Sequence, residues 1–412
     1  MSDLRSYSAV TAAYWGFTLT DGALRMLVLL HFHRLGFSPL DLAYLFLLYE
    51  AMGIVTNFIG GWIAARFGLR LTLFMGLGVQ IFALFLLSGL QENWSLDFSI
   101  IYVMGAQALS GIAKDLTKMS SKSAVKLVVK EDKDQDQNQG LLFRWVALLT
   151  GSKNALKGLG FLLGGVMLQA LGFQTALWAM ALALALVFIV ARLFVDKDMG
   201  RVKSKIRGKE LFSKSKEINV LSFSRIFLFA SRDVWFVVGL PVFLYSAMGW
   251  SFDEVGAFMA VWIIGYGIVQ AFVPRFTKRI KDAQGGVAAA RIWGGLLALL
   301  PAILAYGLWL DFAFSHVFLL VGLLVFGFVF AVNSALHSYL IVACSDEDKV
   351  ALNVGFYYMA NALGRLAGTL LSGLVFQSYG LVACLLVSTV MVLIATVSIF
   401  FMTPQNDLSQ TA

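Results

Sequence analysis

Apolar residues form long runs along the whole chain, and short polar connections separate them. A helix needs about 20 such residues to cross roughly 30 Å of hydrocarbon. Windows of that length identify twelve candidate spans, centred near residues 20, 50, 80, 107, 158, 184, 232, 264, 300, 328, 362 and 392. The pattern therefore predicts an all-α membrane protein with twelve transmembrane helices.

The composition indicates the same class. Of the 412 residues, 59% are hydrophobic and 14% are charged, whereas soluble domains are nearer ~45 to 50% apolar. The first apolar run begins near Ser8 after a short polar start, so we expect no cleaved signal peptide. The cysteines, Cys344 and Cys384, lie in separate apolar runs, so neither a disulfide framework nor a thiolate metal site is expected.

Basic residues are concentrated in alternate connections between the spans. Arg66 and Arg70 follow the second span and Lys126 and Lys130 follow the fourth, whereas the other set of connections contains only Arg34. Cytoplasmic loops of membrane proteins carry an excess of Lys and Arg. We therefore expect a multi-pass protein of the bacterial inner (cytoplasmic) membrane, with both termini in the cytoplasm.

One connection near the middle of the chain is long and basic. Residues 196–217 hold eight Lys or Arg and four Asp or Glu. The segment is predicted to be a cytoplasmic basic linker between two six-helix bundles, residues 1–195 and residues 218–412. A solvated tether is favoured over contact with anionic lipid, although both fit this composition.

The two halves resemble each other weakly. The polar turn at residues 36–41 corresponds to that at residues 249–254, and Asn-Ala-Leu recurs at residues 154–156 and 361–363. Parallel repeats of six spans, with substrate bound between them, characterise the major facilitator plan. The repeats therefore favour that architecture.

A short motif supports this architecture. The stretch GWIAARFGLR at residues 61–70 resembles the signature of the loop between spans 2 and 3 in the major facilitator superfamily. Ala65 stands where the family usually has Asp, so the charge relay attributed to that Asp is in doubt. The resemblance implies a transporter that works by alternating access.

Charged side chains lie inside several spans, where each costs roughly 2.5 to 3.5 kcal/mol at the bilayer centre. Asp21 and Arg25 are four residues apart on one helix face and can pair. The seventh span presents Arg232 and Asp233 at a similar depth. Because Arg suits bidentate recognition of phosphate-like oxyanions, Arg25 and Arg232 are predicted to clamp an anion; a purely structural pair is the alternative.

Further cations extend this set. The fourth span carries lysines at every fourth position from Lys114 to Lys130, and Arg225 lies in the seventh. Together they predict a basic funnel that concentrates anions. The predicted substrate-binding residues are Arg25, Lys118, Lys153, Asn154, Lys157, Arg232 and Arg365.

Few acids accompany them. Glu50 stands alone among apolar neighbours, so it is a candidate proton carrier, with a structural carboxyl hydrogen-bonded to neighbouring helices as the alternative. The predicted coupling or charge-pairing residues are Asp21, Glu50, Asp115 and Asp233. The sequence contains neither a catalytic motif nor a Walker A loop nor a metal-ligand cluster, so we expect no enzyme, no primary pump, no metal and no cofactor.

Five long blocks contain most of the embedded charges, at residues 14–33, 107–129, 144–158, 230–238 and 355–373. They closely resemble the ArsJ-type organoarsenical efflux permeases. The resemblance implies a secondary exporter of 1-arseno-3-phosphoglycerate that confers arsenate resistance. That ester forms when glyceraldehyde-3-phosphate dehydrogenase uses arsenate in place of phosphate, so this enzyme is a functional partner.

A multiply charged ester of this kind fits the embedded cations. Arsenite is held by about three thiolates, which two scattered cysteines cannot provide. Export of another anionic phosphorylated metabolite is the alternative. We expect a monomer in the lipid bilayer that does not bind nucleic acid.

Overall fold

The computed structural model describes residues 2–67, 69–91, 93–129, 135–195, 215–276, 283–345 and 350–403. The first half of this part of the chain forms α1 (Ser2–Arg34), α2 (Pro39–Phe67), α3 (Leu69–Ser88), α4 (Leu96–Val129), α5 (Gln135–Leu171) and α6 (Phe173–Phe194). The second half forms α7 (Lys216–Phe236), α8 (Gly239–Ser246), α9 (Phe252–Phe276), α10 (Ala283–Trp309), α11 (Ser315–Ala343) and α12 (Val350–Ile399). All described elements are helical, which confirms the predicted all-α class.

The number of membrane spans follows from helix length. Within the described residues, ten segments are long and apolar enough to cross a membrane. The charged α1 falls outside that set, although its 33 residues correspond to about 50 Å of helix. The 50 residues of α12 contain a non-helical break at Gly380, which makes two spans of this element. Adding α1 and counting α12 as two spans gives twelve spans, in agreement with the prediction.

The seventh span differs from a simple rod. It is interrupted between α7 and α8, where Val238 leaves the helical conformation. Pro241 lies in the first turn of α8, a position that proline tolerates because the first amides of a helix have no partner within it. The Ser372 hydroxyl of α12 accepts hydrogen bonds from the amides of Val238 and Gly239 at 3.2 and 3.1 Å. A neighbouring helix therefore satisfies the backbone groups that the break exposes.

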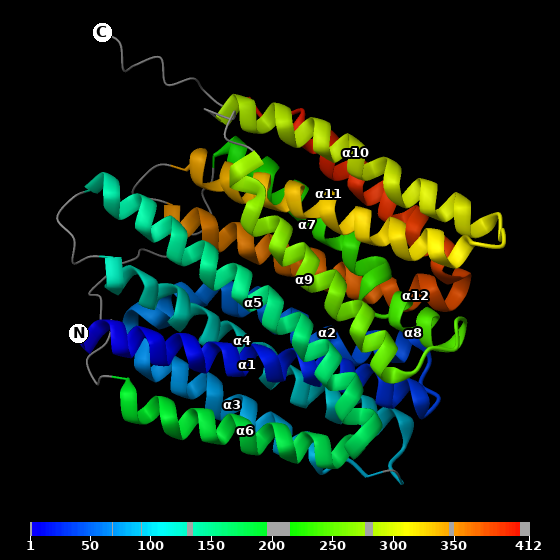
Figure 1. The fold of residues 1–412 in the computed structure, drawn as a ribbon, viewed down its shortest axis with the longest axis horizontal. Helices are drawn as coiled ribbons and strands as arrows, with labels where there is room; N and C mark the ends of the chain where they lie inside the picture. The colour runs from blue at the N-terminus through cyan, green and yellow to red at the C-terminus, as the bar shows by residue number, and fades with distance from the viewer. Residues whose placement is uncertain are drawn as a thin grey trace.

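Two groups of helices lie side by side (Figure 1). In the first, α1 packs on α4, α5 and α6, and α3 packs on α4 and α6; in the second, α12 packs on α7 and α10, and α11 packs on α9 and α10. The groups meet along two seams, α5 against α9 and α2 against α12. These are the two predicted six-helix bundles. Residues 196–214 of the predicted linker lie outside the described residues, and the predicted bundle boundaries stay a prediction.

The internal repeat appears in equivalent turns. Gly36 and Gly249 precede α2 and α9 and have positive φ angles of 89° and 70°, a conformation that glycine adopts without steric cost. In each turn a Ser caps the next helix and bonds an acid three residues on: Ser38 with Asp41, and Ser251 with Glu254. The two halves thus use the same local solution to begin their second long helix.

Both seams are closed at the end of the molecule where α1 meets α2. A Cβ added at Gly165 would collide with the carbonyl oxygen of Phe252 across the α5–α9 seam, and one added at Gly373 would collide with that of Pro39 across the α2–α12 seam. The Leu40 amide also donates to the Gln377 side chain at 3.0 Å. Small residues thus let the two bundles approach to backbone contact here.

Candidate functional site

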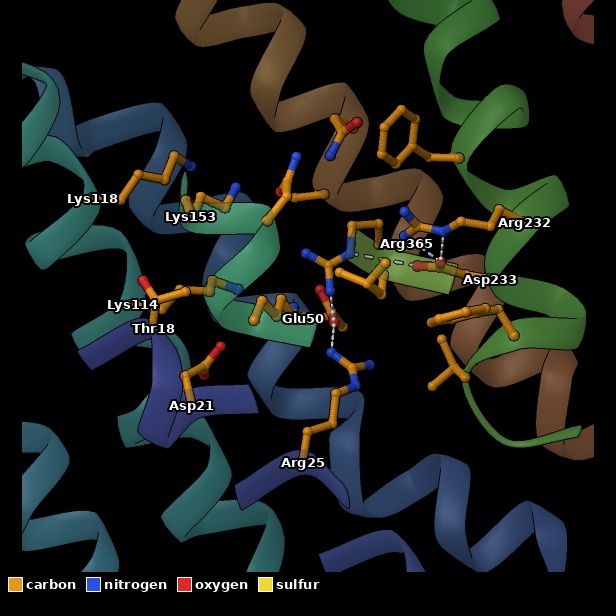
Figure 2. A pocket seen from close by; sticks show the side chains of 18 of the residues that line it. Thr18, Asp21, Arg25, Glu50, Lys114, Lys118, Lys153, Arg232, Asp233 and Arg365 are labelled. Atoms are coloured by element: carbon orange, nitrogen blue, oxygen red, sulfur yellow. Dashed lines mark hydrogen bonds and ion pairs between the residues drawn. The ribbon is translucent and has the colours of Figure 1, made fainter. Parts of the chain in front are cut away.

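A cavity of about 230 Å³ lies between the bundles. The first bundle lines it with α1, α2, α4 and α5, and the second with α7, α9, α11 and α12. All eleven residues predicted from the sequence line this cavity: Asp21, Arg25, Glu50, Asp115, Lys118, Lys153, Asn154, Lys157, Arg232, Asp233 and Arg365. Figure 2 shows Lys114, Lys118 and Lys153 on one side and Arg232 on the other, with Glu50 and Arg365 between them.

The cavity has an excess of positive charge. Eight cationic side chains line it against four carboxylates, so the lining residues carry a formal excess of four positive charges. Such a cleft with apolar walls focuses potential on its interior and attracts anions. The cations are Arg25, Lys114, Lys118, Lys153, Lys157, Arg225, Arg232 and Arg365.

Five of the charged groups form a chain that crosses the cavity. Glu50 Oε1 accepts from Arg25 Nη1 at 3.0 Å and from Arg365 Nη2 at 2.6 Å. Arg365 Nε also lies 3.4 Å from Asp233 Oδ2, and Asp233 Oδ1 pairs with Arg232. Because the Glu50 and Asp233 side chains are 1% and 0% exposed, desolvation would make each of them costly without these partners.

Two expectations for the first bundle were wrong. Arg25 pairs with Glu50 rather than with Asp21, whose Oδ1 accepts from the Tyr49 hydroxyl at 2.7 Å. Glu50 is correspondingly far from isolated, because two guanidinium groups contact it. The local pair does not form because the buried Glu50 carboxylate takes the Arg25 guanidinium, and a charge-assisted hydrogen bond is stronger than a neutral one. The proton-carrier role of Glu50 stays a prediction.

The Lys118 ammonium group is held within the first bundle. Its Nζ donates to Asp115 Oδ1 at 3.0 Å and to Asn57 Oδ1 at 2.6 Å. Asp115 is completely buried and also accepts from the Thr56 hydroxyl at 2.5 Å. Lys118 Nζ further lies 5.2 Å from the ring centre of Tyr358 in the other bundle. Lys118 therefore neutralises Asp115 and contacts the facing helix.

Two other lysines are less fully compensated. Lys114 Nζ lies 4.0 Å from the Tyr49 ring centre, and Lys157 Nζ lies 5.8 Å from that of Phe161. In the described part of the chain, neither ammonium group has a carboxylate oxygen within 4.0 Å. Both charges therefore remain available to an anion in the cavity.

Asn154, between Lys153 and Lys157 on α5, contacts the opposite bundle. Its amide donates to Gln270 Oε1 of α9 at 3.2 Å. It therefore joins the two walls of the cavity, and its contact with substrate stays a prediction. Gln270 could not be predicted from the sequence, because an amide in an apolar span carries no charge that would single it out.

Arg225 provides a buried cation in the second bundle. Its Nε donates to Asn361 Oδ1 at 3.0 Å and its Nη1 donates to the Ser334 carbonyl at 3.3 Å. The guanidinium carbon lies 4.0 Å from the Phe229 ring centre. Among the described ion pairs none involves Arg225, although it is 4% exposed. Asn361 belongs to the repeated Asn-Ala-Leu motif, and this repeat was the feature of the sequence that could have identified Asn361 as a site residue.

Some predicted elements cannot be placed. The side chains of residues 61–69, of Lys122 and of Lys126 lie outside the described residues, as does the whole of Lys130. The loop signature and the cytoplasmic end of the predicted basic funnel therefore stay predictions. The lysines of the funnel that are described, Lys114 and Lys118, both line the cavity.

Solved structures share this architecture. The nucleoside transporter NupG, in a variant form, superposes with a TM-score of 0.70 and 16% identity over 97% of this chain and 98% of that chain. A bacterial homologue of the iron transporter ferroportin gives a TM-score of 0.68 in its outward-facing state, again with 16% identity over 97% of this chain and 98% of that one. In its inward-facing state the TM-score is 0.66, with 19% identity over 96% of this chain and 98% of that chain. At such identities the likeness establishes the fold alone.

No protein of curated function matches the chain. The sequence model of the Major Facilitator Superfamily matches residues 7–283 and residues 221–411, so it covers both bundles. Transporters of this family have twelve spans in two bundles around a central site, as this chain has. The chain belongs to the major facilitator superfamily.

Proposed function

We propose that this secondary transporter exports 1-arseno-3-phosphoglycerate across the bacterial inner membrane and so confers arsenate resistance. The observation that carries the proposal is the cavity between the bundles, which eight cations line against four carboxylates. The proposed substrate has a phosphate at one end and an arsenate at the other. Its several negative charges match the excess of positive charge in the cavity.

The cavity size also favours a small anion. Its volume of about 230 Å³ lies below the roughly 300 to 1,000 Å³ of pockets for drug-sized ligands. Desolvating so many cations without an anionic ligand would be unfavourable. Export of amphipathic drugs is therefore a poor explanation of this site, whereas a three-carbon diacid ester suits both its volume and its charge.

Transport would proceed by alternating access, in which residues 1–195 rock against residues 218–412. With both termini in the cytoplasm, the closed end near Leu40 and Gln377 would face the outside. The ester would enter from the cytoplasm and contact cations of both bundles. Opening would then separate the α5–α9 and α2–α12 seams at Gly165 and Gly373 and release the ester outward.

Another anionic phosphorylated metabolite is the second candidate substrate. Phosphate and arsenate are both tetrahedral oxyanions, and the arginines of the cavity suit either group. The resemblance to the ArsJ-type permeases is what favours the arsenic ester. A functional link to glyceraldehyde-3-phosphate dehydrogenase follows from the same resemblance.

Arsenate resistance tests the proposal in cells that lack other arsenate exporters. Co-expression with an arsenate-using glyceraldehyde-3-phosphate dehydrogenase should confer resistance that neither protein confers alone. Arg25→Ala or Arg232→Ala should abolish it at an unchanged amount of membrane protein. Arg291→Ala is the matched control, because Arg291 bonds the backbone carbonyls of Phe400 and Met402 away from the cavity. Resistance retained in both cavity variants would contradict the proposed role of these arginines.

Everted vesicles separate the two candidate substrates. Dehydrogenase, its substrate and NAD are supplied outside the vesicles with either arsenate or phosphate, and arsenic and phosphorus inside are then measured. Accumulation that requires arsenate supports the arsenic ester. Equal accumulation of phosphorus with phosphate alone would instead favour the second candidate.

A further inference from the structure

Glu50 occupies a special position between the bundles. Its partner Arg25 lies on α1 of the same bundle, whereas Arg365 lies on α12 of the other. Among the ion pairs of the described residues, Glu50 with Arg365 is the one that joins the bundles. A single carboxylate therefore connects both walls at the centre of the cavity (Figure 2).

We propose that Glu50 is an internal counter-anion that holds Arg25 and Arg365 when the cavity is empty, and that the transported anion displaces it from them. Because this role rests on the proposed function, it concerns the same cavity and the same class of ligand. The role differs from that of a proton carrier, since Glu50 stays charged and changes partners. It makes Glu50 a competitor of the ligand.

The contacts of Glu50 are those that a ligand oxyanion would make. Both guanidinium groups bind the same atom, Glu50 Oε1. Arg25 Nη2 is buried and makes no hydrogen bond among the described residues. Arg365 Nε is also buried and makes none, although it lies 3.4 Å from Asp233 Oδ2. Unsatisfied buried donors are costly, and an oxyanion with three terminal oxygens offers more acceptors than one carboxylate oxygen. The two arginines are thus incompletely satisfied by Glu50 and open to exchange.

The cavity also provides for the displaced carboxylate. Lys114 and Lys157 line the same cavity, and within the described residues neither has a carboxylate partner. After displacement, Glu50 can turn toward these ammonium groups without leaving the cavity. The ligand then takes the arginine contacts, and the carboxylate remains neutralised.

An internal anion has a consequence for the transport cycle. Without one, the empty cavity would bring two guanidinium groups of opposite bundles together, and their repulsion in a medium of low dielectric would oppose closure. With Glu50 between them, the empty protein can close and return to its starting state. We therefore expect net export without an exchanged anion, because the return step carries its own counter-charge.

Binding to the purified protein tests the competition directly. The probe is 3-phosphoglycerate, the stable acid that remains when the proposed ester loses its arsenate. Glu50→Gln should bind the probe about tenfold more tightly, which is the gain expected on removal of a competing state if that state is populated to about 90%. Glu254→Gln is the matched control, since Glu254 is exposed and caps α9 at Ser251; its affinity should equal that of the unmodified protein.

Transport in proteoliposomes tests the return step. Uptake of labelled 3-phosphoglycerate is compared between empty vesicles and vesicles preloaded with the unlabelled acid. The unmodified protein should take up the probe in both. Glu50→Gln should keep uptake into preloaded vesicles, whereas its uptake into empty vesicles should fall about tenfold or more. The reason is that the variant without bound ligand no longer returns to its starting state.

The outcomes separate this inference from the proposed function. If the unmodified protein does not bind the probe, the proposed substrate class is wrong. If it binds but Glu50→Gln binds equally or more weakly, or keeps rapid uptake into empty vesicles, the counter-anion role is overturned. Should Glu50→Gln fail to fold, Glu50→Asp keeps the charge on a side chain one methylene shorter, which should weaken its contacts with the two arginines. It should then bind the probe more tightly than the unmodified protein, and unchanged affinity would overturn the inference.

Discussion

The two walls of the cavity differ in their cations. The first bundle contributes Arg25 and four lysines: Lys114, Lys118, Lys153 and Lys157. All three cations of the second bundle are arginines: Arg225, Arg232 and Arg365. A lysine presents a compact charge on a flexible chain, whereas arginine presents a planar fork of fixed geometry. The two walls are therefore suited to different tasks.

The second wall is the more rigidly held. Asp233 pairs with both Arg232 and Arg365, and Asn361 together with the Ser334 carbonyl fixes Arg225. In the first wall, by contrast, the described partners of Lys114 and Lys157 are aromatic rings. The difference suggests that the second bundle orients an oxyanion, whereas the first supplies charge that follows it as the bundles move.

Arg365→Gln should have the largest effect, because Arg365 contacts both Glu50 and Asp233. Removing one member of a buried ion pair costs about 3 kcal/mol or more, which corresponds to about 150-fold in an equilibrium constant. We expect the transport rate in everted vesicles to fall about 100-fold or more and the thermal unfolding midpoint of the purified protein to fall.

Arg291→Gln is the control for this change, since Arg291 also lies on a helix of the second bundle but bonds carbonyl groups at Phe400 and Met402. It should leave transport within about twofold, as is usual for changes outside the site. Equal losses in the two variants would show that the second wall depends on charge number rather than on Arg365.

The charged residues of both walls could be predicted because an embedded charge stands out in an apolar span. Their partners could not, as Arg25 illustrates. Its neighbour four residues away, Asp21, was the natural partner on one helix, yet the pair that forms joins Arg25 to Glu50 on another helix. Arg365 and Glu50 are 315 positions apart. Helix packing brings these two residues together, and no rule of sequence spacing predicts the contact.

Helix existence was similarly easier to predict than helix continuity. Every predicted span centre lies in a helix, because twenty apolar residues suffice to define one. The interruption between α7 and α8 has no comparable hydropathy signal, although Pro241 lies next to it. It depends on Ser372 of α12, whose hydroxyl accepts from the exposed amides, and that partner is distant in sequence.

Exchanging the two kinds of cation tests the contrast itself. Arg225→Lys should reduce transport about 30-fold, because hydrogen bonds of a charged group contribute about 1.5 to 3 kcal/mol and lysine cannot reproduce the fork on Asn361 and Ser334. Lys157→Arg in the first wall should leave the rate within about threefold, since only charge is needed there. Initial rates at several probe concentrations measure both.

A comparable loss in Lys157→Arg would mean that the first wall is as demanding in geometry as the second. An unimpaired Arg225→Lys would remove the orienting role of Arg225. The amount of each variant in the membrane is the necessary control, because both side chains lie in the cavity between packed helices.

Gly373→Val tests whether the two walls must meet at the closed end. The added side chain would meet Pro39 and Leu40 of the other bundle, and overpacking of this kind costs about 1 to 3 kcal/mol. The closed state should therefore lose about tenfold in population relative to the open one. Maleimide labelling of Leu29→Cys, in a chain whose Cys344 and Cys384 are replaced by Ser, should rise accordingly.

Gly78→Val is the control for that experiment, since a Cβ at Gly78 meets no atom within 4 Å. Its labelling at Leu29→Cys should match that of the unmodified chain. If Gly373→Val gives the same labelling as this control, the two bundles do not depend on the close approach at Gly373 to stay closed.

Lys114→Gln should have the smallest effect. Lys114 lies over the Tyr49 ring, and no described carboxylate depends on it within 4.0 Å. Its removal lowers the positive excess of the cavity by one charge without leaving an unpaired acid. We expect the KM to rise about threefold with little change in the maximal rate, because Lys114 attracts the ligand during capture and Lys157 remains to neutralise Glu50 after its displacement.

The ionic strength of the assay sharpens this last expectation. The potential that focuses anions on the cavity mouth is screened over about 10 Å at 0.1 M salt. The difference in KM between Lys114→Gln and the unmodified chain should therefore shrink as salt is raised. A loss of maximal rate that persists at high salt would place Lys114 among the orienting groups and erase the distinction between the lysine wall and the arginine wall.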